Sequence, residues 1–158
     1  MTTVSPWYRD REARRLIVRG YLPWLAGLSL AWETMQLPLY TLWAEATPGA
    51  IAFAVAHCTL GDVLIGSTAL VLALILGREG ALAGWRWRRI IGLMVLLGPG
   101  YTLLSEWLNT TLSRWTYSEL MPTFQLAGIR IGLSPVLQWL VIPPLALYLA
   151  RRSCGDKR

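Results

Sequence analysis

Histidine, cysteine and charged residues are scarce in this chain, and their scarcity excludes several kinds of site. The 158 residues include one histidine, His57, and two cysteines, Cys58 and Cys154. A haem held by two histidines of one chain is therefore excluded, and the sequence has no HxxxH, ExxH or CxxC metal-binding spacing. The two cysteines are predicted to lie at different depths, so we expect no structural disulfide. Charged residues make up 15% of the chain, which is low for a soluble domain.

Apolar residues are abundant and occur in long blocks. They make up 54% of the chain, which includes nine tryptophans, and the mean hydropathy is +0.44. Four blocks reach or exceed the roughly 20 residues that a helix needs to cross a bilayer. These blocks are residues 21–43, 50–77, 90–109 and 131–150. The sequence therefore predicts an all-α fold: an integral membrane four-helix bundle over residues 21–150, with a longer outer loop between the third and fourth helices.

The basic residues indicate an orientation in the membrane. All but two of the fifteen Lys and Arg residues lie before the first block, between the second and third, or after the fourth. Such an excess is typical of cytoplasmic segments, so we expect both termini on the cytoplasmic side of a bacterial inner membrane. Residues 1–20 would form a basic interfacial helix or a frayed tail, residues 151–158 a basic tail, and both would contact membrane lipids. No basic stripe accompanies a docking motif, so we expect no nucleic-acid partner.

Each predicted span carries a polar side chain at middle or outer depth. Glu33 lies near the middle of the first span, His57 and Asp62 in the second, Glu106 near the outer end of the third, and Gln138 in the fourth. Ionisable groups are costly inside a membrane and are therefore functional candidates. Their distribution predicts a polar pocket in the outer half, open or openable towards the periplasm. His57 and Asp62 differ by roughly 140° around their helix, so they would face different neighbours.

Helical spacing places further polar side chains beside these residues. Gln36 follows Glu33 by three residues, and Gln138 follows Ser134 by four, so each pair shares a helix face. Gln36 and Gln138 would orient the ionisable groups and, together with Trp32, contact a ligand, and tryptophan rings could stabilise a positive charge on that ligand. No sequence motif identifies a cofactor.

The function that we favour is proton transfer or acid–base chemistry on an apolar membrane ligand such as a lipid, a quinone or an isoprenoid-like molecule. A carboxylic acid away from water can hold a proton near neutral pH and deliver it. Glu33 and Asp62 would be the titrating catalytic groups. His57 would relay the proton, and Glu106 would connect the site to periplasmic water.

Three other interpretations remain open. His57, Asp62, Glu33 and Glu106 could instead ligate a metal through one nitrogen and three oxygens. The chain could be an accessory or assembly subunit of a larger membrane complex, or a homo-oligomer. The polar residues could also form a purely structural network, with Glu33 bonded to Gln138 and Asp62 bonded to His57.

The outer loop between the third and fourth spans is about twenty residues long, and long loops are often functional. It holds four large side chains: Trp115, Tyr117, Met121 and Phe124. They would either roof the bundle or anchor the loop at the membrane surface.

The strings "AWETMQLPLYTLW", "AHCTLGD", "SEWLN", "WTYSELMP" and "GIRIGLSPVLQW" carry a resemblance that extends over nearly the whole chain. The sequence resembles a group of small bacterial inner-membrane proteins, which implies a membrane location but no particular chemistry. It is more loosely similar to emopamil-binding-type sterol isomerases, which place acidic residues, a histidine and tryptophans in a small helical bundle. No motif of those isomerases matches residue by residue, so they serve as an analogy for what such a pocket can do.

Overall fold

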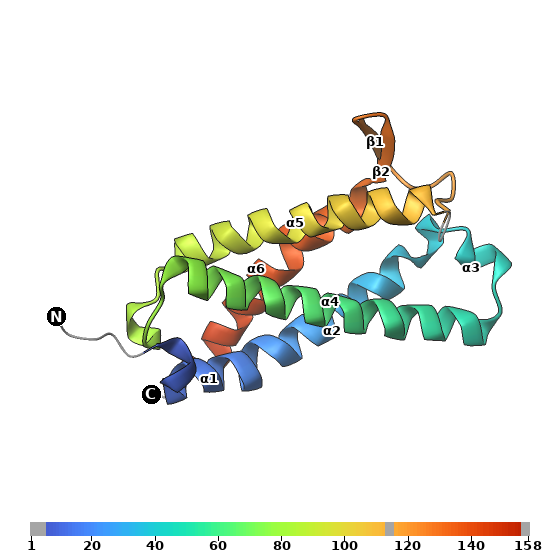
Figure 1. Ribbon diagram of the computed structural model, residues 1–158. Helices are drawn as coiled ribbons and strands as arrows, with labels where there is room; N and C mark the ends of the chain where they lie inside the picture. Colours follow the sequence, from blue (N-terminus) through green and yellow to red (C-terminus); the bar gives the residue numbers. More distant parts are fainter. Residues whose placement is uncertain (1–5, 113–115, 156–158) are drawn as a thin grey trace.

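Four long helices form most of the protein. The computed structural model describes residues 6–112 and 116–155, and these residues are mostly helical. The long helices are α2 (Leu22–Gln36), α4 (Pro48–Gly77), α5 (Trp87–Thr111) and α6 (Leu133–Gly155). They lie side by side, with α2 packed against α4 and α6, and α5 packed against the same two helices (Figure 1). Each long helix therefore has two long neighbours.

Shorter elements connect and extend these helices. They are the 3-10 turns Trp7–Arg9, Leu37–Leu39 and Leu82–Gly84, the helices α1 (Arg11–Leu16) and α3 (Leu42–Glu45), the π-helical turn Ile17–Tyr21, and the strands β1 (Thr123–Leu126) and β2 (Ile129–Gly132). Asp10 begins α1, because its carboxylate accepts a hydrogen bond from the backbone N–H of Ala13. The chain then stays helical through the π turn into α2, so much of the predicted basic segment 1–20 is helix.

Two described helices have the length and composition to cross a membrane. They are α4 and the stretch Leu133–Cys154 of α6. The helix α4 begins where Thr47 accepts a hydrogen bond from the N–H of Ala50, with Pro48 in the first turn. It ends at Arg78, whose backbone is left-handed with φ of 52°. This helix matches the predicted block 50–77 closely.

The first apolar block does not form one helix, contrary to the expected span 21–43. The helix α2 ends at Gln36, and Leu37–Leu39 form a 3-10 turn. Pro38 has no backbone N–H, and its ring would clash with a carbonyl of a continuing α-helix. Tyr40 is then extended and forms an isolated β-bridge with Tyr117 of the long loop. The apolar run is thus divided by its proline.

The long loop between α5 and α6 contains a β-hairpin that the sequence did not predict. Strands β1 and β2 pair antiparallel, and the turn between them uses Ala127 and Gly128, both with positive φ. The hairpin projects from one end of the helices (Figure 1). Residues 129–132 belong to β2, so α6 begins at Leu133, two residues after the predicted start at 131.

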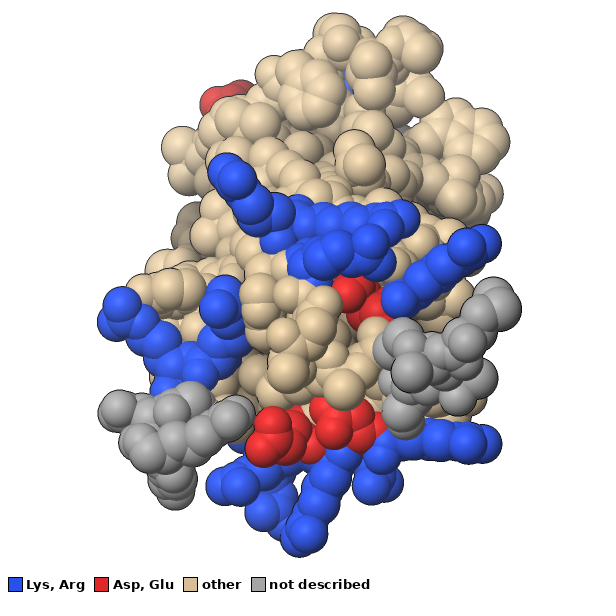
Figure 2. Space-filling model, turned by 90° about the vertical axis from the view of Figure 1, so that its left-hand side faces the viewer, with Lys and Arg blue, Asp and Glu red and all other residues tan. Residues whose placement is uncertain are grey.

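The apolar core lies towards the end of the molecule that holds both termini. Its largest fully buried side chains include Tyr21, Leu25, Leu74, Met94 and Leu147, from all four long helices and the π turn. Lys and Arg side chains gather on this same end, around the α4–α5 connection (Figures 1 and 2). The ends of the molecule therefore differ, one basic and the other carrying α3 and the hairpin.

Candidate functional site

The buried face of α2 carries the residues from which the candidate site is built. Its buried side chains are Leu25, Ser29, Glu33 and Gln36, which recur at three- and four-residue spacing. The first belongs to the apolar core, whereas the other three are polar. Gln36 Nε2 donates a hydrogen bond of 2.8 Å to Glu33 Oε1, within one turn of the helix. The site thus begins where the apolar core gives way to polar side chains.

A buried pair of carboxyl groups joins α2 to α4. Glu33 and Asp62 are each only 9% exposed, and their carboxyl groups lie close enough to interact electrostatically. Two carboxylates that meet away from water repel each other, so this contact favours a proton on one member of the pair. Such a pair titrates as a unit. The arrangement can therefore hold one proton between two helices.

Gln138 of α6 bonds to one of the two carboxyl groups. Its Nε2 donates a hydrogen bond of 2.6 Å to Asp62 Oδ2. Gln138 is 3% exposed, so this bond is shielded from solvent. Hydrogen bonds to charged groups are stronger than those between neutral groups, and a buried acceptor left unpaired is costly. Each carboxyl group is thus held by the amide of a different glutamine, Glu33 by Gln36 and Asp62 by Gln138.

A second bond from α6 fixes the other glutamine. Ser134 Oγ donates a hydrogen bond of 2.8 Å to Gln36 Oε1, one turn before Gln138. The amide of Gln36 therefore directs its oxygen to Ser134 and its nitrogen to Glu33. We call the five residues Glu33, Gln36, Asp62, Ser134 and Gln138 the carboxyl cluster. It unites α2, α4 and α6 through connected hydrogen bonds.

Residues of the long loop hold the helix ends that carry this cluster. Ser118 Oγ donates a 2.9 Å hydrogen bond to the carbonyl of Pro38, and its backbone N–H bonds to Leu39 just beyond α2. Buried Tyr117 accepts a hydrogen bond of 3.1 Å from the N–H of Gly132 just before α6. Two adjacent loop residues therefore fix the end of α2 and the start of α6. Together, these loop bonds hold the end of α2, with Gln36, close to Ser134 near the start of α6.

Of the four large loop residues in the sequence prediction, two lie inside the fold. Tyr117 and Met121 are buried, whereas Phe124 is 37% exposed. Trp115 lies outside the described residues. The loop thus combines buried contacts with an exposed aromatic side chain.

The structure does not bring His57 to the carboxyl cluster. Its side chain is exposed on α4 and stacks on Phe53, with ring centroids 5.7 Å apart. Residues five apart on a helix face different directions, so Asp62 turns inward while His57 turns outward. Glu106 is part of α5, but its side chain lies outside the described part of the structure. The cluster as described therefore contains neither predicted partner.

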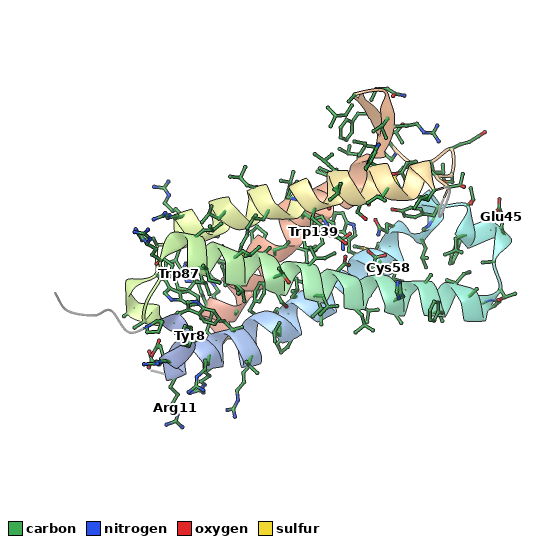
Figure 3. The ribbon with its side chains drawn as sticks, in the orientation of Figure 1. Tyr8, Arg11, Glu45, Cys58, Trp87 and Trp139 are labelled. Carbon is green, nitrogen blue, oxygen red and sulfur yellow. The ribbon has the colours of Figure 1, made fainter. Side chains whose placement is uncertain are left out.

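Within the described residues, no group of three or more His, Cys, Asp and Glu side chains is placed to hold a metal ion. The two carboxyl groups act electrostatically on Cys58, which lies one turn before Asp62 and is labelled in Figure 3. The predicted ligand set of one nitrogen and three oxygens is not assembled there.

Three buried polar groups lie within about one helical turn of Glu33 or Asp62, and two of them were not predicted from the sequence. The side-chain atoms Ser29 Oγ, Trp32 Nε1 and Thr59 Oγ1 have no hydrogen-bond partner among the described residues. Trp32 was expected to contact a ligand, but Ser29 and Thr59 were overlooked. The spacing of Ser29, four residues before Glu33, was the signal that could have identified it.

Comparisons with protein-family models, with curated proteins and with solved structures find no match to this chain.

Proposed function

We propose that the chain is a multi-pass protein of a bacterial inner membrane, whose Glu33–Asp62 pair takes up and releases a proton in acid–base chemistry on an apolar membrane ligand. The single observation that carries this proposal is the contact between two buried carboxyl groups on neighbouring helices. Three helices contribute to holding the pair, and amide groups occupy its other acceptor positions. A proton bound there is largely shielded from water and held between two carboxyl groups.

The outward faces of the helices support a membrane location. Large apolar side chains are widely exposed on them, including Met35, Phe53, Leu64 and Leu96, each about 70% exposed. A soluble protein rarely exposes so many, whereas lipid would cover them. We propose that all four long helices cross the bilayer, with α1 and the π turn extending the shorter α2.

The charged end supports the proposed orientation. The arginines before α2, in the α4–α5 connection and at the end of α6 lie on one end of the molecule (Figure 2). Aromatic rings accompany them, with the guanidinium of Arg151 lying 4.0 Å from the ring centroid of Trp87. Basic and aromatic side chains are typical of the cytoplasmic interface. Both termini would then be cytoplasmic, and the carboxyl cluster would lie in the middle and outer part of the membrane.

A proton-uptake measurement tests this function. The purified protein in lipid nanodiscs is shifted between about pH 6 and about pH 9, a range in which exposed carboxyl groups stay ionised, and the protons bound are counted with a pH-sensitive dye. The wild type should bind about one proton per chain more than Glu33→Gln or Asp62→Asn, because the pair titrates as a unit. Glu45→Gln is the matched control, since Glu45 is exposed on α3, away from the cluster (Figure 3).

The two carboxyl variants should both differ from the control. If the exposed Glu45→Gln variant lost as many protons as Glu33→Gln, the pair would not be a distinct proton site. If neither cluster variant changed the uptake, the proposed function would be wrong.

A second candidate is an accessory subunit of a larger membrane complex. The observation that favours it is the projecting hairpin, whose strand β1 is exposed along its length and carries Phe124 and Leu126. Strand β2 packs against the rest of the fold, whereas the apolar side chains of β1 are uncovered, so a partner would bury them. Co-purification of other subunits in mild detergent, lost on replacing Phe124 and Leu126 by serine, would favour this candidate.

A further inference from the structure

A hollow in the surface lies near the basic end of α6, away from the carboxyl cluster. Its volume is about 280 Å³, and the side chains of Tyr148, Arg151 and Arg152 line it. The two arginines follow Tyr148 by three and four residues, so the three side chains share one face of the helix. All three are exposed. A ligand can therefore reach two guanidinium groups from outside the protein.

Aromatic rings hold both guanidinium groups beside the hollow. Cζ of Arg151 lies 4.0 Å from the ring centroid of Trp87 on α5, and Cζ of Arg152 lies 4.9 Å from the ring centroid of Tyr148. These contacts use the face of a ring and no acceptor atom, so N–H groups remain available to donate hydrogen bonds. A side chain already held against a ring loses less rotamer freedom when it binds a ligand. Both arginines are thus positioned in advance for an acceptor.

The neighbouring carboxylate groups have other partners. Glu79 forms an ion pair of 3.0 Å with Arg86, and Asp10 accepts two backbone hydrogen bonds. Within the described residues, neither Arg151 nor Arg152 forms an ion pair or a hydrogen bond through its side chain. Two positive charges therefore face one hollow without a carboxylate of the described chain beside them. An anion in the hollow would reduce the repulsion between them.

An exposed apolar stripe of α6 leads to this hollow. Leu137 and Val141 are 39% and 43% exposed, and they precede Tyr148 by eleven and seven residues, which are close to whole turns of the helix. The stripe therefore lies on the same side of α6 as the hollow. In the proposed membrane location, lipid chains cover the stripe, and the hollow lies where their head groups begin. A phospholipid would contact both features, whereas a soluble anion would contact the hollow alone.

We infer that Arg151 and Arg152 bind the phosphate group of one anionic phospholipid of the cytoplasmic leaflet, whose acyl chains lie along the exposed stripe of α6. A guanidinium group matches two phosphate oxygens in geometry and stays charged at physiological pH. Two such groups favour a head group of net negative charge over a zwitterionic one, whose ammonium group they repel. The inference rests on the membrane location in the proposed function. It does not depend on the proton chemistry, because none of its residues belongs to the carboxyl cluster.

Native mass spectrometry of the purified full chain in mild detergent tests the inference. The protein is titrated with dioleoyl phosphatidylglycerol and, separately, with dioleoyl phosphatidylcholine, which has the same acyl chains and no net charge. The wild type should retain one phosphatidylglycerol at low lipid concentration, with at least about fivefold preference over phosphatidylcholine. Equal retention of the two lipids would overturn the inference.

Variants assign the site to the two arginines. Arg151→Gln and Arg152→Gln should each weaken phosphatidylglycerol binding about fivefold, and the double variant should weaken it about 25-fold. Arg11→Gln is the matched control, because it removes the same charge from an exposed side chain that points away from the helices and does not line the hollow (Figure 3). All of these side chains are exposed, so the variants should fold, and thermal unfolding verifies this.

Tyr148 has a positioning role that a matched pair of variants separates from charge. Tyr148→Leu removes the ring beside Arg152 and should weaken phosphatidylglycerol binding about twofold to threefold. Tyr148→Phe keeps the ring and should bind the lipid as the wild type does. Weaker binding by both variants to the same extent would overturn the role of the ring in positioning Arg152.

The remaining outcomes identify what else could fill the hollow. If Arg11→Gln weakened binding as much as Arg151→Gln, overall charge would attract the lipid and the site would be overturned. Glycerol phosphate that bound as tightly as the whole lipid would identify soluble phosphate esters as the ligand, which would also overturn it. Asp156, four residues after Arg152, lies outside the described residues. If lipid bound only to Asp156→Asn, a carboxylate of the chain itself would occupy the hollow, and the inference would be wrong.

Proton uptake by the same preparations separates this inference from the proposed function. Lipid binding lost in the double arginine variant, with proton uptake unchanged, would support a separate lipid site. A wild type that takes up the expected proton but binds no phosphatidylglycerol would overturn the lipid site alone. A wild type that binds the lipid but takes up no additional proton would support the lipid site and contradict the proton chemistry alone.

Discussion

Gln138 Nε2 lies 2.6 Å from Asp62 Oδ2 and joins the buried face of α6 to that of α4. The two residues are 76 positions apart in the sequence, so this bond fixes how two distant helices meet. One turn earlier in α6, Ser134 bonds to Gln36 of α2. Two side chains of α6 thus join it to both of these helices.

Replacing this amide should destabilise the fold. Gln138→Ala leaves the buried carboxyl group of Asp62 without its amide donor, and we expect the free energy of unfolding to fall by about 1–3 kcal/mol. The measurement is thermal or denaturant unfolding in lipid nanodiscs. Gln125→Ala is the control, since Gln125 is exposed on the hairpin, and its effect should stay within about 0.5 kcal/mol. Equal stability of the two variants would show that the amide bonds contribute little.

The close approach of α2 and α4 at Gly66 gives a second prediction. A Cβ atom placed there would lie 2.8 Å from Cδ2 of the buried Leu25, so Gly66→Ala should destabilise the protein by about 1–3 kcal/mol. Gly61→Ala, on the same helix, meets nothing within 4 Å and should have little effect. Comparing the unfolding temperatures of the two variants checks the packing. A similar loss in both would mean that the helices do not approach as described.

The loop residue Tyr117 should matter for the cluster as well as for the loop. Tyr117→Phe removes the acceptor for the buried N–H of Gly132, and we expect a loss of about 1–3 kcal/mol in the free energy of unfolding. Tyr148→Phe is a suitable control, because Tyr148 is 47% exposed and keeps its ring beside Arg152. The measurement is denaturant unfolding of both variants. Equal free energies of unfolding would show that the bond from Gly132 to Tyr117 does not stabilise the start of α6.

Much of the helical framework follows from the apolar blocks alone. The block 50–77 became Pro48–Gly77, since its ends carry a threonine cap and a change of backbone conformation after the last apolar residue. The sequence shows Pro38 within the first block, but a proline can either kink a helix or end it. Which of the two occurs depends on whether neighbouring segments support a continued helix. Beyond this proline, Tyr40 pairs with Tyr117, and such a distant contact leaves no local signal in the sequence.

The candidate site was predictable only within single helices. The spacing of Gln36 after Glu33 implied a shared face, and a hydrogen bond joins them. Which side chain would meet Asp62 depended on the neighbours of α4, which a sequence does not specify. The alternative bond from Asp62 to His57 is absent, because His57 turns to the exposed face beside Phe53. The direct Glu33–Asp62 contact likewise required the packing of α2 on α4.

The proposed orientation predicts the accessibility of the two ends. Leu126→Cys on the hairpin should react with a membrane-impermeant maleimide in intact cells, since that end would face the periplasm. Arg88→Cys, on the basic end, should react only after the membrane is permeabilised. The wild-type chain, whose two cysteines are partly buried, gives the background. Labelling in the opposite order would reverse the proposed orientation.

The shared proton of Glu33 and Asp62 is tested most directly by the infrared carbonyl stretch of a protonated carboxyl group. In lipid nanodiscs near neutral pH, the wild type should show one such band, which shifts when water is replaced by deuterium oxide. Glu33→Gln and Asp62→Asn should each remove or displace this band, whereas Glu45→Gln should leave it unchanged. A wild-type spectrum without a protonated carboxyl band, or one that both cluster variants retain unaltered, would contradict the shared proton and the function built on it.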